Sequence, residues 1–173
     1  MQNSSSNIEI RPEVAGDIEV IADLTHAAFR HKPYSSGTEQ FIVNALRRNG
    51  QLTLSLVAVD GTQVVGHVAV SPVTISTGTT GWFGLGPISV SPARQGQGIG
   101  SMLMGAALTA LRRDAAHGCV VLGDPAYYGR FGFKVYANLV LPDVPREFFQ
   151  ALPFSDDVPA GEVAFHESFN AKK

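Results

Sequence analysis

A short glycine-rich segment is the part of this chain whose residue types and spacing are best suited to chemistry. Gly96, Gly98 and Gly100 alternate with other residues in the run QGQGIG of residues 95–100. An apolar strand pattern precedes the run at 87–91. From residue 99 to 111 apolar residues recur at three- and four-residue steps, as on one face of a helix. The sequence therefore predicts a strand, a glycine-rich turn and a helix in succession.

The start of such a helix is a site for an anion. The first turn carries four backbone N–H groups that have no carbonyl partner, and the aligned peptide dipoles add partial positive charge there. Glycine lacks the Cβ atom that would hold a ligand away from the backbone, and Ser101 adds a hydroxyl donor. This chemistry favours a phosphate-bearing ligand.

The spacing of the turn separates three kinds of phosphate site. A P-loop needs Lys and then Ser or Thr after its last glycine, and the positions after Gly100 hold Ser and Met instead. A Rossmann-type NAD site needs G-x-G-x-x-G, with an acidic residue at the end of the next strand. Here the spacing is G-x-G-x-G, and the next apolar run, 119–122, is followed by Gly-Asp. The pattern that fits is Q-x-x-G-x-G, from Gln95 to Gly100.

A second motif lies further along the chain. Residues 127–133 read YYGRFGF, an aromatic–tyrosine pair followed by Gly-Phe. In their order and spacing, the two motifs resemble the signatures of the GNAT-type N-acetyltransferases, whose Q-x-x-G-x-G loop binds the pyrophosphate of acetyl-CoA. Segments 33–39, 81–87 and 123–126 resemble a bacterial subgroup of acetyltransferases of unassigned substrate. The similarity extends over roughly residues 7–169.

The resemblance implies an α/β (α+β) GNAT fold with a mixed central sheet of about six to seven strands and about four helices. In this fold a V-shaped splay opens between the fourth and fifth strands, and the pantetheine arm pairs there like an added strand. The apolar run 82–90 suits that place, because its Gly84, Gly86 and Pro87 favour a bulge or a strand that parts from its neighbour. The connection between the first two helices should border the acceptor site.

Carried onto the motif positions, the resemblance implies acetyl-CoA as co-substrate and no metal. The implied cofactor-binding residues are Ile88, Ser89, Val90, Gln95, Gly96, Gln97, Gly98, Ile99, Gly100, Ser101, Tyr128 and Arg130. Arg94 and Arg130 suit the CoA phosphates, because a guanidinium can pair with phosphate through two hydrogen bonds. Both arginines suit a solvated surface equally well.

The resemblance also implies direct attack of a primary amine on the thioester, without a covalent enzyme intermediate. Tyr128 matches the motif tyrosine that acts as general acid for the CoA thiolate. A phenol with an ordinary pKa near 10 is protonated at pH 7 and is therefore in the donating state. The backbone N–H of Ser89 or Val90 is the expected oxyanion donor.

The general base, the acceptor and catalysis itself stay open. The run 82–91 holds no carboxylate and no histidine, which leaves His67, Asp124 or a chain of water molecules. The missing carboxylate also keeps a non-catalytic acyl-CoA-binding or sensor module as the alternative. Acidic residues late in the chain suit a cationic small-molecule or peptide amine, and equally a solvated loop; they are Asp143, Glu147, Asp156 and Asp157.

The elements that must position these residues follow from periodicity and turn chemistry. Strands are expected at 8–11, 52–59, 64–73, 82–90, 119–122, 132–135 and 161–169, with an Asp-Gly hairpin turn at 60–63. Helices are expected at 17–29, 38–46 and 98–115, with a short one at 124–128. Residues 138–160 should be irregular apart from a turn at 146–152, and should form a wall on the substrate side.

Composition sets limits on the class of protein. The 173 residues predict one domain, at 8–170, after a disordered leader at 1–7. A net charge of −2 argues against a nucleic-acid partner, and the one cysteine, Cys119, is expected in the core. No run approaches the ~20 apolar residues of a membrane span, and no signal-peptide pattern occurs. We therefore expect a cytoplasmic protein with no membrane partner; a homodimer, common in the family, stays open.

Overall fold

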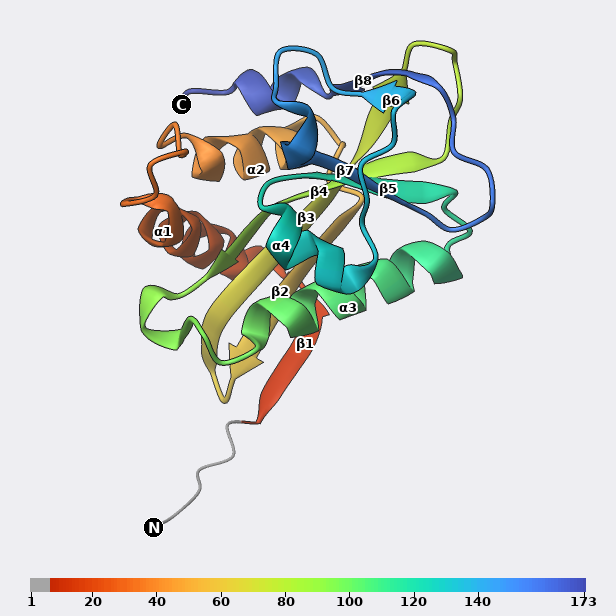
Figure 1. Ribbon diagram of the computed structural model, residues 1–173. Coiled ribbons are helices and arrows are strands. Elements are labelled where there is room, and N and C mark those ends of the chain that lie inside the picture. The colour runs from red at the N-terminus through yellow and green to blue at the C-terminus, as the bar shows by residue number, and fades with distance from the viewer. Residues whose placement is uncertain (1–6) are drawn as a thin grey trace.

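The computed structural model describes residues 7–173, and these form one mixed sheet with helices on both faces (Figure 1). The described strands are β1 (Ile8–Pro12), β2 (Leu54–Asp60), β3 (Gln63–Ile75), β4 (Trp82–Val90), β5 (Gly118–Leu122), β6 (Leu139–Val140), β7 (Phe149–Pro153) and β8 (Gly161–Phe165). The described α-helices are α1 (Ile18–Phe29), α2 (Glu39–Arg48), α3 (Ile99–Arg113) and α4 (Pro125–Tyr128). Apart from residue 7, the predicted leader lies outside the described residues.

The sheet has a main path of six strands, in the order β1-β2-β3-β4-β5-β7, with β6 and β8 off this path, so that eight strands lie within residues 7–173. The pairs along the path are antiparallel except for β4–β5, which is parallel. β8 pairs with the far end of β3 and with β6. The predicted fold class, a mixed sheet with about four helices, is confirmed.

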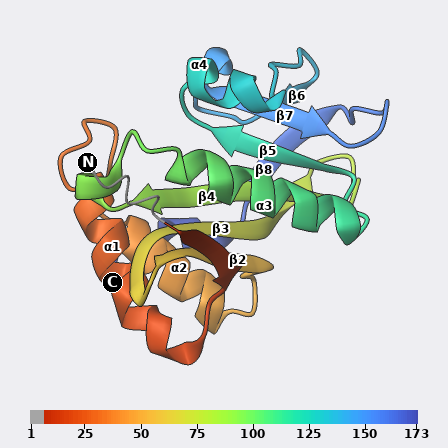
Figure 2. The same cartoon turned by 90° about the horizontal axis from the view of Figure 1, so that it is seen from below.

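Helices cover the two faces of the sheet separately (Figures 1 and 2). On one face α3 packs against β2 and β3, where Leu103 and Met104 meet Val68 and other buried residues. On the other face α1 and α2 pack against each other and the sheet, with Ile21 and Val43 in the buried cluster. The strands β2 and β3 contribute side chains to the buried clusters on both faces of the sheet, because successive side chains of a strand point to opposite faces.

The strands β4 and β5 part after a short paired stretch. Their parallel pairing joins only Trp82, Phe83 and Gly84 to residues 118–120. Beyond Gly84 the strand β4 continues to Val90 paired with β3 alone, while the other edge of β5 pairs with β7. In the pairing of β3 with β4, Val68 lies opposite Ile88 but Val70 lies opposite Leu85, so β4 has one extra residue between these pairs. The predicted bulge is therefore present.

Three predicted elements differ from the structure. Residues 132–135 form no strand, because only Lys134 makes a bridge, to Ala151 of β7. The segment 149–153, predicted as part of a turn, is the strand β7, whose pairing with β5 overrides its weak local pattern. The last strand ends at Phe165 rather than residue 169, because the His166 side chain accepts from the Ser168 N–H and starts a 3₁₀ turn.

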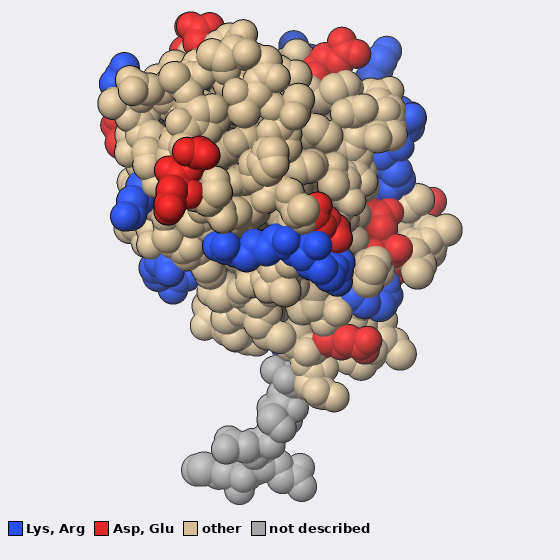
Figure 3. All heavy atoms as spheres, turned by 90° about the vertical axis from the view of Figure 1, so that its right-hand side faces the viewer, with Lys and Arg blue, Asp and Glu red and all other residues tan. Residues whose placement is uncertain are grey.

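The face of the molecule drawn in Figure 3 carries charges of both signs. On the face drawn in Figure 3, Lys and Arg are interspersed with Asp and Glu, and wide areas carry neither. A nucleic-acid site would instead gather basic side chains on one face. None of the helices between residues 7 and 173 combines the length and apolar character needed to span a bilayer.

A partly buried polar cluster ties the β1–β3 end of the sheet to α2. Arg47 donates to both carboxylate oxygens of Glu13, each at 2.9 Å, and Ser55 donates to the same carboxylate. The Ser55 hydroxyl also lies 2.8 Å from Nε2 of His67, whose side chain is fully buried. Burial lowers the pKa of His67 to about 4, because water no longer solvates the charged ring. His67 is therefore neutral at pH 7.

This burial makes the fold acid-sensitive in a defined window. Between the ordinary histidine pKa of 6.5 and the folded value of about 4, only the unfolded chain binds the extra proton. We expect the free energy of unfolding to fall by about 3 kcal/mol from pH 7 to pH 4 through this residue. Chemical denaturation of wild type and His67→Gln across this range measures the difference. His31→Gln, at an exposed histidine, is the matched control; equal pH dependence in wild type and His67→Gln would contradict the assignment.

Candidate active site

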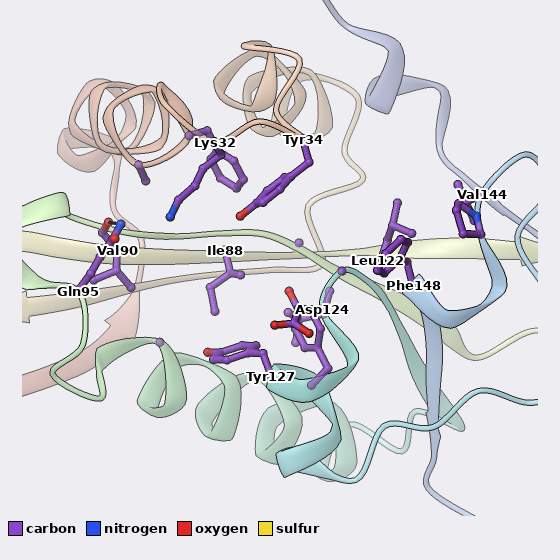
Figure 4. A pocket seen from close by; sticks show the side chains of 18 residues that line it. Lys32, Tyr34, Ile88, Val90, Gln95, Leu122, Asp124, Tyr127, Val144 and Phe148 are labelled. Atoms are coloured by element: carbon purple, nitrogen blue, oxygen red, sulfur yellow. Dashed lines mark hydrogen bonds between the residues drawn. The ribbon is translucent and has the colours of Figure 1, made fainter.

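A cavity of about 800 Å³ opens where β4 and β5 part (Figure 4). Its walls come from the end of α1 and the loop after it, from β4, from the start of α3, from the β5–α4 turn and from the segment before β7. The lining residues are Ala28, Phe29, Lys32, Tyr34, Leu85, Gly86, Ile88, Val90, Gln95, Gly100, Leu122, Gly123, Asp124, Tyr127, Tyr128, Val144, Pro145 and Phe148. The volume is within the range of small-molecule and cofactor sites, roughly 300–1,000 Å³.

The helix α3 starts at this cavity with no side-chain cap. Its N-cap, Gly98, has φ +83°, and no side chain of the described chain caps the helix there. Gly96, in the turn before it, has φ +76°. L-residues rarely adopt such backbone conformations, so the turn requires glycine at both positions. The amides of the first turn, at 99–101, remain available for a ligand.

Tyr127 lies over the same helix start. A Cβ atom added to Gly100 would lie 2.8 Å from the Tyr127 hydroxyl, so the hydroxyl can occupy this position only because residue 100 is glycine. The Arg130 guanidinium lies 4.9 Å from the centroid of the Tyr127 ring and donates to Ser101 Oγ at 3.4 Å. Phenol, guanidinium and serine hydroxyl thus gather around uncapped amides, an arrangement suited to an anion. From the sequence, Tyr127 is expected only to pack, as the aromatic residue that precedes Tyr128 in the motif.

The unpaired edge of β4 distinguishes between the backbone N–H groups of Ser89 and Val90, the two oxyanion donors expected from the sequence. The N–H of Ser91 donates to the carbonyl of Val65 on β3, at 2.9 Å. Successive amides of a strand point to opposite edges, so the Ser89 N–H also points to β3 and the Val90 N–H points to the parted side. The Ser89 side chain is buried, whereas Val90 lines the cavity. Val90 is therefore the donor on the cavity side.

Tyr128 lines the cavity from α4, which Asp124 and Pro125 start. Its ring meets Phe133 edge-on with the centroids 6.0 Å apart, and a Cβ atom on Gly123 would lie 2.7 Å from it. Burial raises the pKa of the Tyr128 hydroxyl, and the neighbouring Tyr127 raises it further. The phenol is therefore firmly protonated at neutral pH.

The structure brings only part of the predicted cofactor set into the cavity lining. The residues that line it are Ile88, Val90, Gln95, Gly100 and Tyr128. Those outside the lining are Ser89 and Ile99, whose side chains are buried, Gly96, Gln97 and Gly98 in the exposed turn, and Ser101 and Arg130 beside it.

Polar side chains of the turn itself are partly engaged by the protein. The Gln95 side chain donates to the Val90 carbonyl at 3.1 Å. Arg94 pairs with Asp60 at 2.8 Å and donates to the Gln97 side chain at 3.0 Å. Much of the Arg94 charge is thus already compensated, which leaves Arg130 as the guanidinium directed at the helix start.

The structure also separates the two side chains considered as general base. Asp124 lines the cavity, and its Oδ1 accepts from the Ala126 N–H at 2.9 Å as the N-cap of α4. His67 belongs to the partly buried cluster on the α1–α2 face and is absent from the cavity lining. Cys119 is fully buried, and burial raises its pKa, as expected of a core thiol. Among residues 7–173, no group of His, Cys, Asp and Glu side chains is arranged to hold a metal ion.

Several lining residues were not identified one by one from the sequence, although Val144 and Phe148 belong to the segment 138–160 that was expected to form a wall of the substrate site. Lys32 and Tyr34 stand in the loop between α1 and α2, which the resemblance placed beside the acceptor site. Leu122, Val144 and Phe148 complete the opposite wall. The structure marks these residues by their apolar exposure, which the sequence does not reveal: Tyr34, Leu122 and Phe148 are 77%, 47% and 41% exposed.

Known proteins match this chain in both sequence and structure. A family model described as an acetyltransferase (GNAT) domain matches residues 51–135. The N-acetyltransferase YhbS of Escherichia coli K12 is 37% identical over 151 residues, which cover 83% of this chain and 90% of YhbS. The crystal structure of YhbS with CoA has a TM-score of 0.88 at 34% identity, covering 98% of this chain and 96% of that one. A Brucella melitensis GNAT acetyltransferase crystallised with acetyl-CoA is 49% identical, with a TM-score of 0.85 and coverage of 95% and 99%.

The chain belongs to the GNAT family of acetyltransferases. The resemblance carried by the two sequence motifs is thereby confirmed, and so is the prediction of an acyltransferase.

The position of Gly100 under Tyr127 gives a matched pair of variants on one helix. Gly100→Ala places a methyl group against the Tyr127 hydroxyl, whereas Gly105→Ala meets nothing within 4 Å. We expect Gly100→Ala to weaken CoA binding about tenfold, equivalent to about 1.4 kcal/mol, and Gly105→Ala to leave binding unchanged. Isothermal titration calorimetry with CoA measures both. Equal affinities in the two variants would contradict the placement of the ligand at this helix start.

Proposed function

We propose that this protein transfers the acetyl group of acetyl-CoA to a primary amine. One observation carries the proposal: the uncapped start of α3 and the open edge of β4 face the same cavity. The first favours a diphosphate, and the second offers unpaired backbone groups to an extended chain. CoA joins a diphosphate to such a chain, and the two relatives named above were crystallised with CoA or acetyl-CoA.

The residues divide into those that hold the diphosphate and those that hold the pantetheine arm. Amides of Gly98, Ile99, Gly100 and Ser101 bind the diphosphate, with the turn residues Gln95, Gly96 and Gln97 around it. Arg130 adds a charged donor, and a cation–π contact with the Tyr127 ring holds its guanidinium. Along β4 the arm lies against Ile88, Ser89 and Val90, where the backbone supplies its hydrogen bonds. The size and donor set of the cavity fit this ligand.

The chemical step needs stabilisation of an oxyanion and a proton for sulfur. The amine nitrogen attacks the thioester carbonyl carbon, the new C–N bond forms, and the C–S bond breaks as the tetrahedral intermediate collapses. The Val90 N–H stabilises the carbonyl oxygen while it is negative. Tyr128 gives its proton to the departing thiolate and becomes a phenolate. The nitrogen releases a proton to solvent, and solvent in turn returns a proton to the phenolate. The attacking nitrogen must be neutral, so an amine that binds as an ammonium first gives one proton to solvent, and this step requires no dedicated base.

Tyr128→Phe tests the assigned acid. We expect kcat to fall by about 10²-fold, the lower end of what a positioned acid contributes, with the dissociation constant of CoA unchanged. Tyr127→Phe is the matched control, since it removes the neighbouring hydroxyl and should weaken CoA binding more than turnover. Thiol release from acetyl-CoA and calorimetry with CoA give the two readouts.

Two outcomes would count against the proposal. Undiminished turnover in Tyr128→Phe would remove the phenol from the mechanism. Tight CoA binding without thiol release for any amine would instead favour a non-catalytic acyl-CoA-binding module, an alternative supported by the lack of a carboxylate on β4.

A further inference from the structure

We infer that the acceptor is a primary amine with an apolar body and no acidic group near the nitrogen, and that Asp124 binds its ammonium form before the nitrogen gives a proton to solvent and attacks. The inference rests on the proposed function and concerns the half of the cavity away from the α3 start. It assigns to Asp124 a binding role in substrate selection.

The cavity has two chemically different ends (Figure 4). Gln95 and Gly100 mark the end at the glycine-rich turn, which the diphosphate and the pantetheine arm occupy in the proposed function. Leu122, Val144 and Phe148 mark the other end, beyond Asp124. The acceptor must reach the thioester from this second end, because the first is filled.

The second end is apolar where a protein surface is usually polar. Leu122 and Phe148 are two of the seven large hydrophobic residues that the described chain exposes most, at 47% and 41%, and Tyr34, at 77%, lies over the middle of the cavity (Figure 4). Val144 and Pro145 fill the space beside Phe148 in the lining. An exposed apolar cluster of this kind marks a site that is covered in the working state. An acceptor with an aliphatic or aromatic body would cover it.

The charges of the lining select a cation at this end. Asp124 is the carboxylate among the lining residues, and one of its oxygens remains free because the N-cap bond uses Oδ1 alone. Lys32 is the cation of the lining, and its side chain points toward Val90 and Gln95 at the opposite end (Figure 4). An ammonium is attracted to Asp124, whereas a carboxylate on the same carbon would be repelled by it. α-Amino acids are therefore disfavoured.

A fully buried amide holds these walls in place. Gln150 on β7 is 1% exposed, and its Nε2 donates to the Gly123 carbonyl at 3.0 Å and to that of Glu147 at 3.5 Å. Gly123 precedes Asp124, and Glu147 precedes Phe148. One side chain thus fixes the carboxylate relative to the apolar wall, so the acceptor end is preorganised.

The test compares three amines at fixed acetyl-CoA, read as free thiol. 2-Phenylethylamine has an apolar body, phenylalanine adds a carboxylate beside the nitrogen, and putrescine replaces the apolar body with a second charge. We expect kcat/KM for 2-phenylethylamine to exceed that of each of the others at least about tenfold, a difference worth about 1.4 kcal/mol.

Two variants connect that preference to the named residues. Asp124→Asn keeps an N-cap acceptor and removes the charge, and should raise KM for 2-phenylethylamine about tenfold without changing CoA affinity. Phe148→Ala should lower kcat/KM for the same amine, while Val20→Ala, at a residue of similar exposure on α1, should not. Calorimetry of 2-phenylethylamine binding to the CoA complex reports the same changes without turnover.

Different results overturn different claims. Preference for phenylalanine or putrescine, or an Asp124→Asn variant with unchanged KM, overturns the inference and leaves acetyl transfer in place. No thiol release with any amine, in a protein that binds CoA, overturns the proposed function and this inference with it.

Discussion

Unpaired backbone groups at the junction of α3 and β4 are the constraint on which the rest of this structure depends. Proteins pair nearly all of their backbone donors and acceptors, yet here the first turn of a helix has no side-chain cap and a central strand loses its neighbour beyond Gly84. The two sets of open groups face one cavity. A ligand that carries an anionic group and an extended polar chain satisfies both, which is why acetyl-CoA fits this fold.

The remaining architecture keeps that junction open. β7 pairs with all five residues of β5 at its far edge, whereas β4 pairs with only the first three. The bulge of β4, between Leu85 and Ile88, lies in the length of β4 that no longer pairs with β5. The partly buried Glu13–Arg47–Ser55–His67 cluster ties the opposite end of the sheet to α2. Desolvation keeps His67 neutral there, and His67 lies outside the cavity lining.

The glycine-rich site could be predicted from the sequence because it depends on neighbouring residues. Features that depend on contacts between distant parts of the chain could not. The turn 95–100 could be identified because glycine at positive φ and a helix start depend on adjacent residues. The strand β7 could not be identified from the sequence, because residues Phe149–Pro153 form a strand only through their pairing with β5. The cavity brings Tyr34 together with Leu122 and Phe148, residues far apart in the chain. The donor at Val90 rather than Ser89 required the register of β3 and β4.

Amide NMR during a titration with CoA tests the central claim most directly, because it observes the backbone groups themselves. The account predicts that the largest shifts fall on Ile99, Gly100 and Ser101 at the start of α3 and on Ile88 and Val90 along β4. Amides of β1 and α2, which lie outside the cavity lining, should be nearly unchanged. Shifts spread evenly over the protein, or confined to residues outside these two segments, would contradict the account.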